Sequence, residues 1–207
     1  MSVSEDRTVQ PTTAAPSTGI ADPAPLGLAA FAATTFLLSA ANAGWMTKAT
    51  GDAWLGYAFA YGGFAQLLAG MWEFRNRNVF GATAFSTYGG FWIGLALWAL
   101  LVAPKAASPA AADHDIAWIL LTFAIINTYL LILSTQVNMA VFLVFLTLEI
   151  TEIILFIGNF GGSTGTVKFG GYVGLVTALV AFYTSAAGVS NGLAGKVRFP
   201  VGRPLIS

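Results

Sequence analysis

The sequence predicts an all-α membrane protein, a bundle of six transmembrane helices, and three observations lead to this class. Hydrophobic residues make up 57% of the 207 positions and charged residues only 9%, whereas soluble domains carry about 25% charged residues. The mean hydropathy is +0.75. Apolar runs recur at the length of roughly 20 residues that a bilayer core about 30 Å thick requires. Strand-like alternation is not seen, and backbone groups in lipid must be satisfied internally, so these runs are expected to be helices.

Each expected span is a mostly apolar run with a short connection to the next. The one substantial connection is Pro104–Asp115, which is rich in alanine, proline and serine, whereas the fourth and fifth spans nearly meet at Gln136. The expected spans are Leu26–Met46, Ala53–Phe74, Phe80–Ala103, Ile116–Thr135, Val137–Gly158 and Phe169–Ser190.

The chain divides into one membrane domain, residues 21–192, and two tails. Residues 1–20 are polar and lack a basic region followed by an apolar one, so they are expected to be a disordered tail rather than a cleavable signal. Residues 193–207 are expected to be a short C-terminal tail. Positive charge favours the cytoplasmic side, and an inside N-terminus places six basic residues there against three outside. Those inside are Arg7, Arg75, Arg77, Lys196, Arg198 and Arg203, and those outside are Lys48, Lys105 and Lys168.

Composition also excludes several kinds of site. Cysteine is absent, which rules out disulfides, thiolate chemistry and cysteine-bound metals. The single histidine, His114, cannot build a histidine-rich metal site, and a net charge of zero gives no indication of nucleic-acid binding. No metal or cofactor is expected, and nothing indicates an enzyme.

The first span follows the segment Asp22-Pro23-Ala24-Pro25-Leu26-Gly27-Leu28. The two prolines fix the backbone and are expected to push Asp22 and Ala24 out of the helical region. Such a start would leave unpaired N–H groups at a helix N-terminus, where the partial positive charge suits an anion. Within the span, Thr35, Ser39 and Asn42 share one face with Phe31 and Leu38. This face either lines a pathway or hydrogen-bonds to neighbouring helices.

The second span contains Gln66 and Glu73, which are seven residues apart and share a face. Glu73 lies at the cytoplasmic end beside Arg75 and Arg77. It is therefore either a salt-bridged interfacial residue or part of a vestibule or proton path.

The third span has an unusually polar and glycine-rich start, running from Asn78 to Trp92. It places Tyr88 at mid-helix, away from the interfacial belts where tyrosine is usual. Gly90 and Gly94 have the spacing that lets helix backbones approach closely.

The fifth span carries two carboxylates, Glu149 and Glu152, near its centre. They are three residues apart and share a face. They are either proton acceptors or structural groups with polar partners, and no basic residue lies within a span to pair with them. The sixth span repeats the small-residue spacing at Gly170 and Gly174 and contains Ala181.

Three of these segments resemble the acetate uptake transporter family. That family starts its first span with Asn-Pro-Ala-Pro-Leu-Gly-Leu, and Asp22 replaces the asparagine here. Its second span carries Gly-Gly-x-x-Gln-x-x-x-Gly-x-x-Glu, matched by Gly62 to Glu73, and its third is close to the segment from Phe80 to Trp92. The resemblance covers residues 22–189.

The resemblance implies a six-helix protomer in a hexameric ring in the cell membrane, with both termini cytoplasmic. It implies transport of acetate, either coupled to protons or channel-like, with succinate or small monocarboxylates other than acetate as further substrates. A non-transporting sensor or scaffold, and a channel for small neutral solutes, are the alternatives.

The resemblance also implies roles for single residues. Phe31, Tyr88 and Leu148 would narrow the conduit, with Leu146 in place of Leu148 if the fifth helix carries an offset. Glu73, Glu149 and Glu152 are candidates for proton coupling. The substrate-binding candidates are Leu26, Gly27, Thr34, Thr35, Asn42, Gln66, Thr83 and Ala181.

Overall fold

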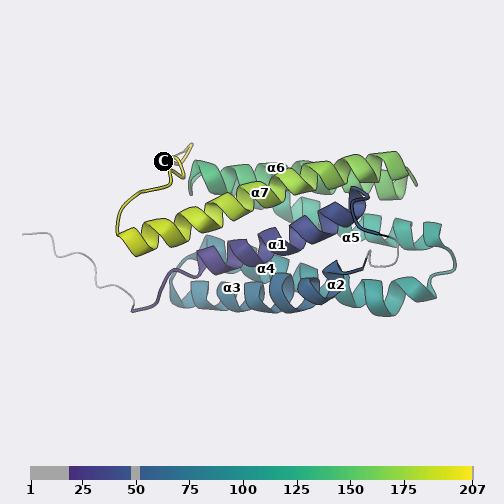
Figure 1. Cartoon of the computed structure of the whole chain (residues 1–207), viewed down its shortest axis with the longest axis horizontal. Helices are drawn as coiled ribbons and strands as arrows, with labels where there is room; N and C mark the ends of the chain where they lie inside the picture. The colour runs from purple at the N-terminus through teal and green to yellow at the C-terminus, as the bar shows by residue number, and fades with distance from the viewer. Residues whose placement is uncertain (1–18, 48–51, 207) are drawn as a thin grey trace, which may run out of the picture.

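The computed structural model describes residues 19–47 and 52–206 of the chain. The expected disordered tail over residues 1–20 lies outside the described residues except for its last two, and Lys48 also lies outside them. The described chain is an all-helical bundle whose long helices run along one axis (Figure 1). This confirms the predicted fold class.

Five helical stretches are long and apolar enough to cross a membrane. They are α1 (Ala24–Asn42), α4 (Val79–Leu97) continued by η2 (Trp98–Val102) and η3 (Ala103–Lys105), α5 (Pro109–Ser134), α6 (Met139–Phe160) and α7 (Thr164–Ala194). The remaining predicted span, the second along the chain, is composite. It consists of α2 (Trp54–Tyr57), the π-helix η1 (Ala58–Ala65) and α3 (Gln66–Arg75).

Glycines account for how the π-helix of the second span packs. A π-turn is wider than an α-turn and is uncommon in long runs. A Cβ on Gly62 would overlap the Thr34 side chain of α1, and one on Gly63 would lie 2.6 Å from Ile93 of α4. The Gly62–Gly63 pair therefore lets the widened turn fit between two neighbouring helices.

The start of α1 differs from the prediction. Ala24 is the first residue of the helix and Pro25 the second, so the expectation that Ala24 leaves the helical region is wrong. Proline is compatible with the first helical turn, where its missing N–H has no partner to lose. The expected unpaired donors are also absent from this turn. The Asp22 carboxylate accepts from the Ala24 N–H at 3.0 Å, and the N–H groups of Leu26 and Gly27 donate to the Pro23 carbonyl.

The connection over Pro104–Asp115 is shorter than predicted, because α5 already begins at Pro109. The Ser108 hydroxyl accepts a hydrogen bond from the Ala111 N–H, and proline follows at the first helical position. Both are signals of a helix start, and they outweigh the polar composition of the segment.

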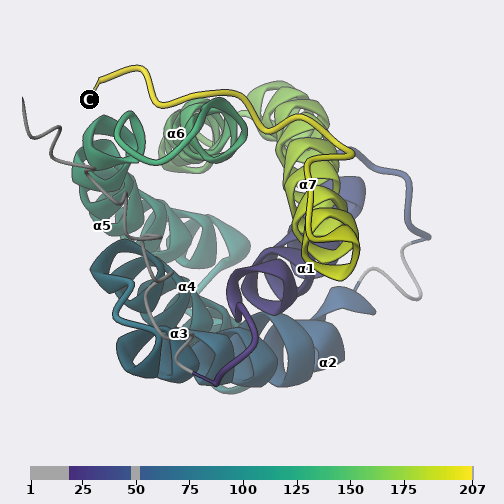
Figure 2. The same ribbon diagram turned by 90° about the vertical axis from the view of Figure 1, so that its left-hand side faces the viewer.

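The helices form a ring when viewed along the bundle axis (Figure 2). α7 packs against both α1 and α6, α6 packs against α5, and α4 packs against α3 and η1. Both ends of the described chain lie at the same end of the bundle (Figure 1), which we call the termini end. A chain with an even number of spans must have both termini on the same side. We call the opposite end of the bundle the far end.

Small residues pack α7 tightly, as predicted. A Cβ on Gly174 would overlap Ser39 of α1, and one on Gly170 would lie 2.7 Å from Leu155 of α6. The same prediction for α4 is wrong within the protomer. Gly90 and Gly94 have open space at the Cβ position, and Gly89 is the residue packed against Leu67.

The C-terminal tail is a strap rather than a free end. After α7, residues 198–206 run back across the termini end toward α6 (Figure 2). The Asn191 side chain bonds the backbone of Arg198 and Phe199. The Ala140 N–H donates to the Val201 carbonyl, and the Leu205 and Ile206 N–H groups donate to the Thr135 carbonyl.

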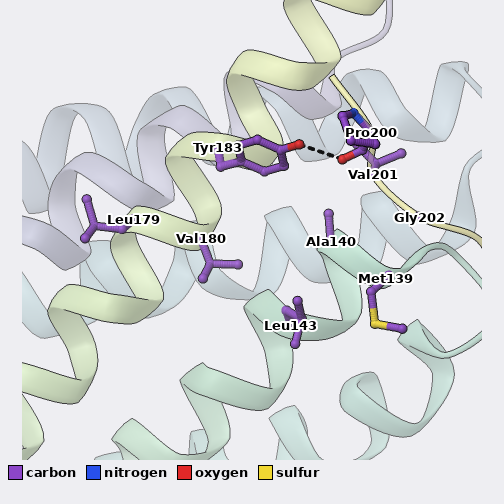
Figure 3. A pocket seen from close by; sticks show the side chains of 9 residues that line it. All are labelled: Met139, Ala140, Leu143, Leu179, Val180, Tyr183, Pro200, Val201 and Gly202. Carbon is purple, nitrogen blue, oxygen red and sulfur yellow. Dashed lines mark hydrogen bonds between the residues drawn. The ribbon is translucent and has the colours of Figure 1, made fainter. Parts of the chain in front are cut away.

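An apolar groove lies under this strap, between α6 and α7 (Figure 3). The Tyr183 hydroxyl crosses it and donates to the Pro200 carbonyl at 2.6 Å. The strap thus joins the end of the last helix to the start of α6 and to the α5–α6 turn.

Candidate functional site

Three cavities follow one another through the middle of the ring. The first, the vestibule, has a volume of about 300 Å³ and opens at the termini end. It is lined by the starts of α1, α4 and α6, the end of α7 and the strap residue Val201. Its polar lining consists of Asp22, Asn78, Asn138, Thr184 and Asn191.

Deeper in the bundle lie two smaller cavities. The inner cavity measures about 20 Å³ and shares Leu28, Ala84, Phe85 and Phe145 with the vestibule. The far cavity measures about 40 Å³. A single water molecule needs about 10–15 Å³ by this kind of measure, so neither cavity has room for a carboxylic acid in this conformation.

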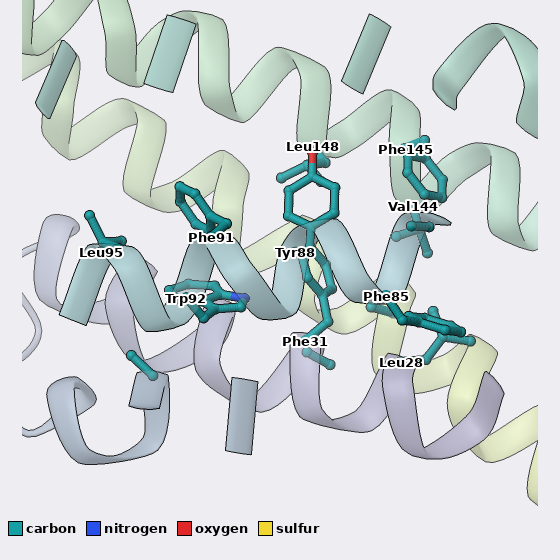
Figure 4. Close-up of a cluster of buried hydrophobic side chains, with 14 of the residues drawn as sticks. Leu28, Phe31, Phe85, Tyr88, Phe91, Trp92, Leu95, Val144, Phe145 and Leu148 are labelled. Carbon is teal, nitrogen blue, oxygen red and sulfur yellow. The ribbon is translucent and has the colours of Figure 1, made fainter. Parts of the chain in front are cut away.

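Phe31, Tyr88 and Leu148 are the three residues common to the walls of the inner and far cavities. They are 4%, 3% and 6% exposed. The rings of Phe31 and Tyr88 meet edge to face with centroids 5.7 Å apart, and Figure 4 shows the Tyr88 ring between Phe31 and Leu148. The structure therefore brings together the three residues predicted to narrow a conduit, and Leu148 rather than Leu146 lines the cavities.

The polar face of α1 lines the far cavity. Thr35, Ser39 and Asn42 all contribute to its wall, together with Phe31 and Leu38. The polar face predicted for the first span is therefore turned toward a cavity inside the bundle.

Several buried polar atoms at these cavities have no hydrogen-bond partner within the described part of the protein. They are Thr35 Oγ1, Gln66 Oε1, Trp92 Nε1 and Glu152 Oε2. Gln66 lines the inner cavity and the other three line the far cavity. Figure 4 shows the Trp92 indole nitrogen turned toward Tyr88 and Phe31. A buried polar group without a hydrogen-bond partner costs free energy. A polar solute in the conduit would form hydrogen bonds with these groups.

A hydrogen-bonded network lies behind the constriction. The Tyr88 hydroxyl is 3.0 Å from Asn127 Oδ1 and 3.3 Å from Glu152 Oε1. The Asn127 amide also donates to Glu149 Oε2 at 2.7 Å. The Thr128 hydroxyl lies 2.8 Å from Glu149 Oε1 and 2.9 Å from the Ala124 carbonyl oxygen of its own helix. The two glutamates thus have polar partners on α4 and α5, and Asn127 joins them.

Other predicted site residues lie outside the three cavities. Leu26 is 46% exposed on the outside of the bundle, and Gly27 packs against the Phe85 ring. The Thr34 hydroxyl donates to the Ala30 carbonyl. Thr83 lines an outer groove between α4 and α5, and Ala181 is fully buried in the apolar core.

Glu73 is fully buried at the end of α3 and lines none of these cavities. Its Oε2 accepts a hydrogen bond from the Asn76 amide at 3.1 Å. Gly81 leaves room for its other oxygen, since a Cβ there would lie 2.7 Å from Glu73 Oε1. One expectation was a salt bridge from Glu73 to Arg75 or Arg77. Among the described residues, the side chain that bonds to Glu73 is instead the amide of Asn76 in the same turn.

Sequence reasoning missed Asn127 and Trp92. A signal for Asn127 was present, because it is an amide in the middle of a span, where polar groups are expensive. Trp92 lay within the polar segment of the third span, but only the structure shows which way its N–H points.

The comparisons with known proteins agree with this geometry. The profile of the GPR1/FUN34/yaaH family matches residues 6–202. The chain is 35% identical over 187 residues to the succinate-acetate/proton symporter SatP of Escherichia coli, covering 90% of this chain and 97% of that protein. It is 36% identical over 188 residues to acetate permease A of Emericella nidulans, covering 83% of this chain and 62% of that longer protein. The solved structure of the bacterial acetate channel SatP superposes with a TM-score of 0.81 at 31% identity, covering 88% of this chain and 99% of that one.

Proposed function

Because the chain belongs to the GPR1/FUN34/yaaH family, a family of multi-pass membrane transporters and channels, we propose that it carries acetate across the cell membrane together with a proton. The observation that carries the proposal is the row of three cavities, of which the inner and the far cavity meet at Phe31, Tyr88 and Leu148. The similarity to SatP and to acetate permease A supports acetate as the substrate. Succinate and small monocarboxylates other than acetate are the further substrates to test.

The chemistry of the far cavity fits a small carboxylic acid. Thr35 Oγ1 and Trp92 Nε1 each offer a hydrogen to the carboxyl oxygens, and the rings of Phe31 and Phe91 face the methyl group. No lysine or arginine is among the residues that line the three cavities in the described chain. A fixed positive charge would hold the anion too tightly for rapid passage, which needs weak sites.

In the proposed mechanism the Phe31, Tyr88 and Leu148 side chains form a gate. Acetate passes between the far end and the vestibule, and passage requires the Tyr88 ring or the Leu148 side chain to move, since the cavities on either side of these residues are too small for the solute. Transfer of the protonated acid across this apolar gate avoids moving an unpaired charge through a low-dielectric region.

The proposed orientation places the termini end in the cytoplasm. Arg75, Arg77, Lys196, Arg198 and Arg203 belong to this end, and Lys105 and Lys168 belong to the far end. This distribution favours an inside position for both termini.

The proposed assembly is a hexameric ring. Gly90 and Gly94 offer a surface without side chains on the outside of α4, where a second copy can approach closely. Chemical cross-linking in membranes would measure the number of protomers.

Uptake of labelled acetate into proteoliposomes tests the function. The acetate flux is expected to exceed that of empty vesicles. A pH gradient, acidic outside and neutral inside, should increase this flux. Thr35→Val is expected to lower flux by about tenfold, since a lost hydrogen bond to a charged group is worth about 1.5–3 kcal/mol. Wild-type flux no higher than in empty vesicles would contradict transport and favour the sensor or scaffold.

The charge at Asp22 gives a separate prediction, because this carboxylate both caps α1 and lines the vestibule. Asp22→Asn keeps a capping oxygen and removes the charge, so half-saturation should occur at a lower acetate concentration with unchanged stability. The gain should stay below about tenfold, because an exposed charge is screened. Asp22→Ala should show the same kinetic gain and lose about 0.5–2 kcal/mol of stability with the cap. Unchanged half-saturation in both variants would show that the vestibule charge does not act on the substrate.

A further inference from the structure

The Asn127 side chain has only one orientation that satisfies its neighbours. Its amide nitrogen is 3.0 Å from the Phe145 carbonyl oxygen and 2.7 Å from Glu149 Oε2. The carbonyl oxygen can only accept, so the NH₂ group must face it. The reversed amide would place an acceptor against an acceptor. Asn127 Oδ1 therefore faces the Tyr88 hydroxyl.

This orientation fixes the direction of the hydrogen bond at Tyr88. Asn127 Oδ1 is an acceptor, so the Tyr88 hydroxyl donates to it over 3.0 Å. A phenol has a single hydrogen to give. The hydroxyl makes a second, longer contact of 3.3 Å to Glu152 Oε1. Because the Tyr88 hydrogen is directed at Asn127 Oδ1, this contact is a full hydrogen bond when the glutamate supplies the hydrogen and the phenol oxygen accepts it.

We infer that Glu152 is held as a neutral carboxylic acid that donates to the Tyr88 oxygen, and that it is the residue carrying the coupled proton at the gate. Asn127 is the positioning residue, because it turns the Tyr88 hydrogen away from Glu152. The second half of the inference, proton coupling, rests on the proposed transport function, whereas the protonation of Glu152 stands without it.

The surroundings of Glu152 agree with a neutral acid. The residue is 3% exposed and lines the far cavity, and its Oε2 has no partner in the described chain. The titratable groups that act on it are Glu149 of its own helix and Tyr88 of α4, and Tyr129 of α5 lies near Tyr88.

The remaining polar groups packed around Glu152 are neutral. They are Thr35, Ser39 and Asn42 of α1, Asn127 of α5, and Thr177 of α7, which bonds the neighbouring Thr151. A carboxylate there would be an unpaired buried charge next to a second acid, which is strongly unfavourable.

The proton transfer is balanced by the substrate. When acetate reaches the far cavity, the O–H bond of Glu152 breaks and a new O–H bond forms on the acetate oxygen. The acid leaves uncharged, and Glu152 remains as a carboxylate beside Tyr88 until a proton from water restores it. In that interval the Tyr88 hydrogen has two competing acceptors, Asn127 Oδ1 and Glu152 Oε1, which links the protonation of Glu152 to the position of the gate ring.

Infrared difference spectroscopy on the full chain in lipid vesicles, without substrate, tests the protonation directly. The wild type at neutral pH is expected to show the C=O band of a buried carboxylic acid with an isotope shift in D₂O. Glu152→Gln should lose this band, and the matched variant Glu149→Gln should retain it. Tyr88→Phe should shift its frequency, because the acid loses its acceptor, and this variant keeps the test valid if Glu152→Gln does not fold. Absence of the band in the wild type, or its persistence in folded Glu152→Gln, would overturn the inference.

A second measurement addresses coupling. With a pH dye inside the vesicles, wild-type acetate influx should bring in protons beyond the leak of empty vesicles. Glu152→Gln should lose this proton movement and the pH dependence of acetate flux, while Asn127→Leu should shift the pH profile. A wild-type infrared band together with no acetate flux would sink the proposed function and leave the protonated glutamate standing. Normal pH dependence in a transporting Glu152→Gln would overturn its role as proton carrier.

Discussion

Replacing Leu148 with alanine is expected to join the inner and far cavities and to admit larger carboxylates. Leu148 is one of the three side chains that separate these cavities, and truncation removes most of its volume. Uptake of a carboxylate with a longer chain than acetate should rise by about tenfold or more, the range that a methylene-sized change in an apolar pocket produces. Radiolabelled uptake into proteoliposomes, acetate against the longer acid, would measure the change in selectivity.

Leu130→Ala is the matched control for this variant. Leu130 is buried in the same apolar core but lines an outer groove between α4 and α5 instead of the conduit. Both variants should lose about 2–5 kcal/mol of stability, as buried leucine-to-alanine changes do. Only Leu148→Ala should alter selectivity, so an equal change in the two variants would remove Leu148 from the gate.

Gly171→Ala is expected to destabilise the fold through the contact between α7 and α1. An added Cβ would lie 2.5 Å from the Ala43 backbone nitrogen and 2.8 Å from the Ser39 carbonyl oxygen of α1. Backbone atoms cannot rotate away, so α7 and α1 would have to separate along their contact. We expect a loss of about 3 kcal/mol, at the upper end of typical overpacking costs.

Gly165→Ala provides the comparison on the same helix. Gly165 has nothing within 4 Å of the Cβ position, and both variants gain the same helix propensity. Thermal unfolding in detergent, followed by tryptophan fluorescence, should show a lower midpoint for Gly171→Ala and no decrease for Gly165→Ala. Equal midpoints would mean that α1 and α7 can move apart to accommodate the added methyl group at little cost in stability.

Periodicity and span length were sufficient to predict the bundle, because the bilayer imposes both on any helix that crosses it. The face carrying Phe31, Thr35 and Ser39 was also predictable, since 3.6 residues per turn bring these positions into line. Helix starts were less predictable. Ser108 and Pro109 begin α5 inside a segment whose composition resembles a loop. The prolines beside Asp22 lie at the start of a helix instead of keeping its first residue out of the helical region.

The network behind the gate could not be derived from one helix at a time. Glu149 and Glu152 were visible as an unusual pair, but their partners come from α4 and α5. The hydrogen-bond directions depend on Asn127, whose amide is fixed by the Phe145 carbonyl of α6. These contacts depend on how segments far apart in the sequence are placed in space. The pattern of residues within one helix does not determine that placement.

The C-terminal strap has a consequence for how the protein is handled in the laboratory. Val201 forms part of the vestibule wall, and residues 199–206 bond to α6, α7 and the α5–α6 turn. An affinity tag joined to the C-terminus would therefore be attached to the strap whose Val201 forms part of the vestibule wall. A chain cut after Ala194 would keep every membrane helix and still lose this part of the vestibule wall. Tags placed at the N-terminus, ahead of residue 19, leave the strap and its bonds unchanged and suit transport measurements better.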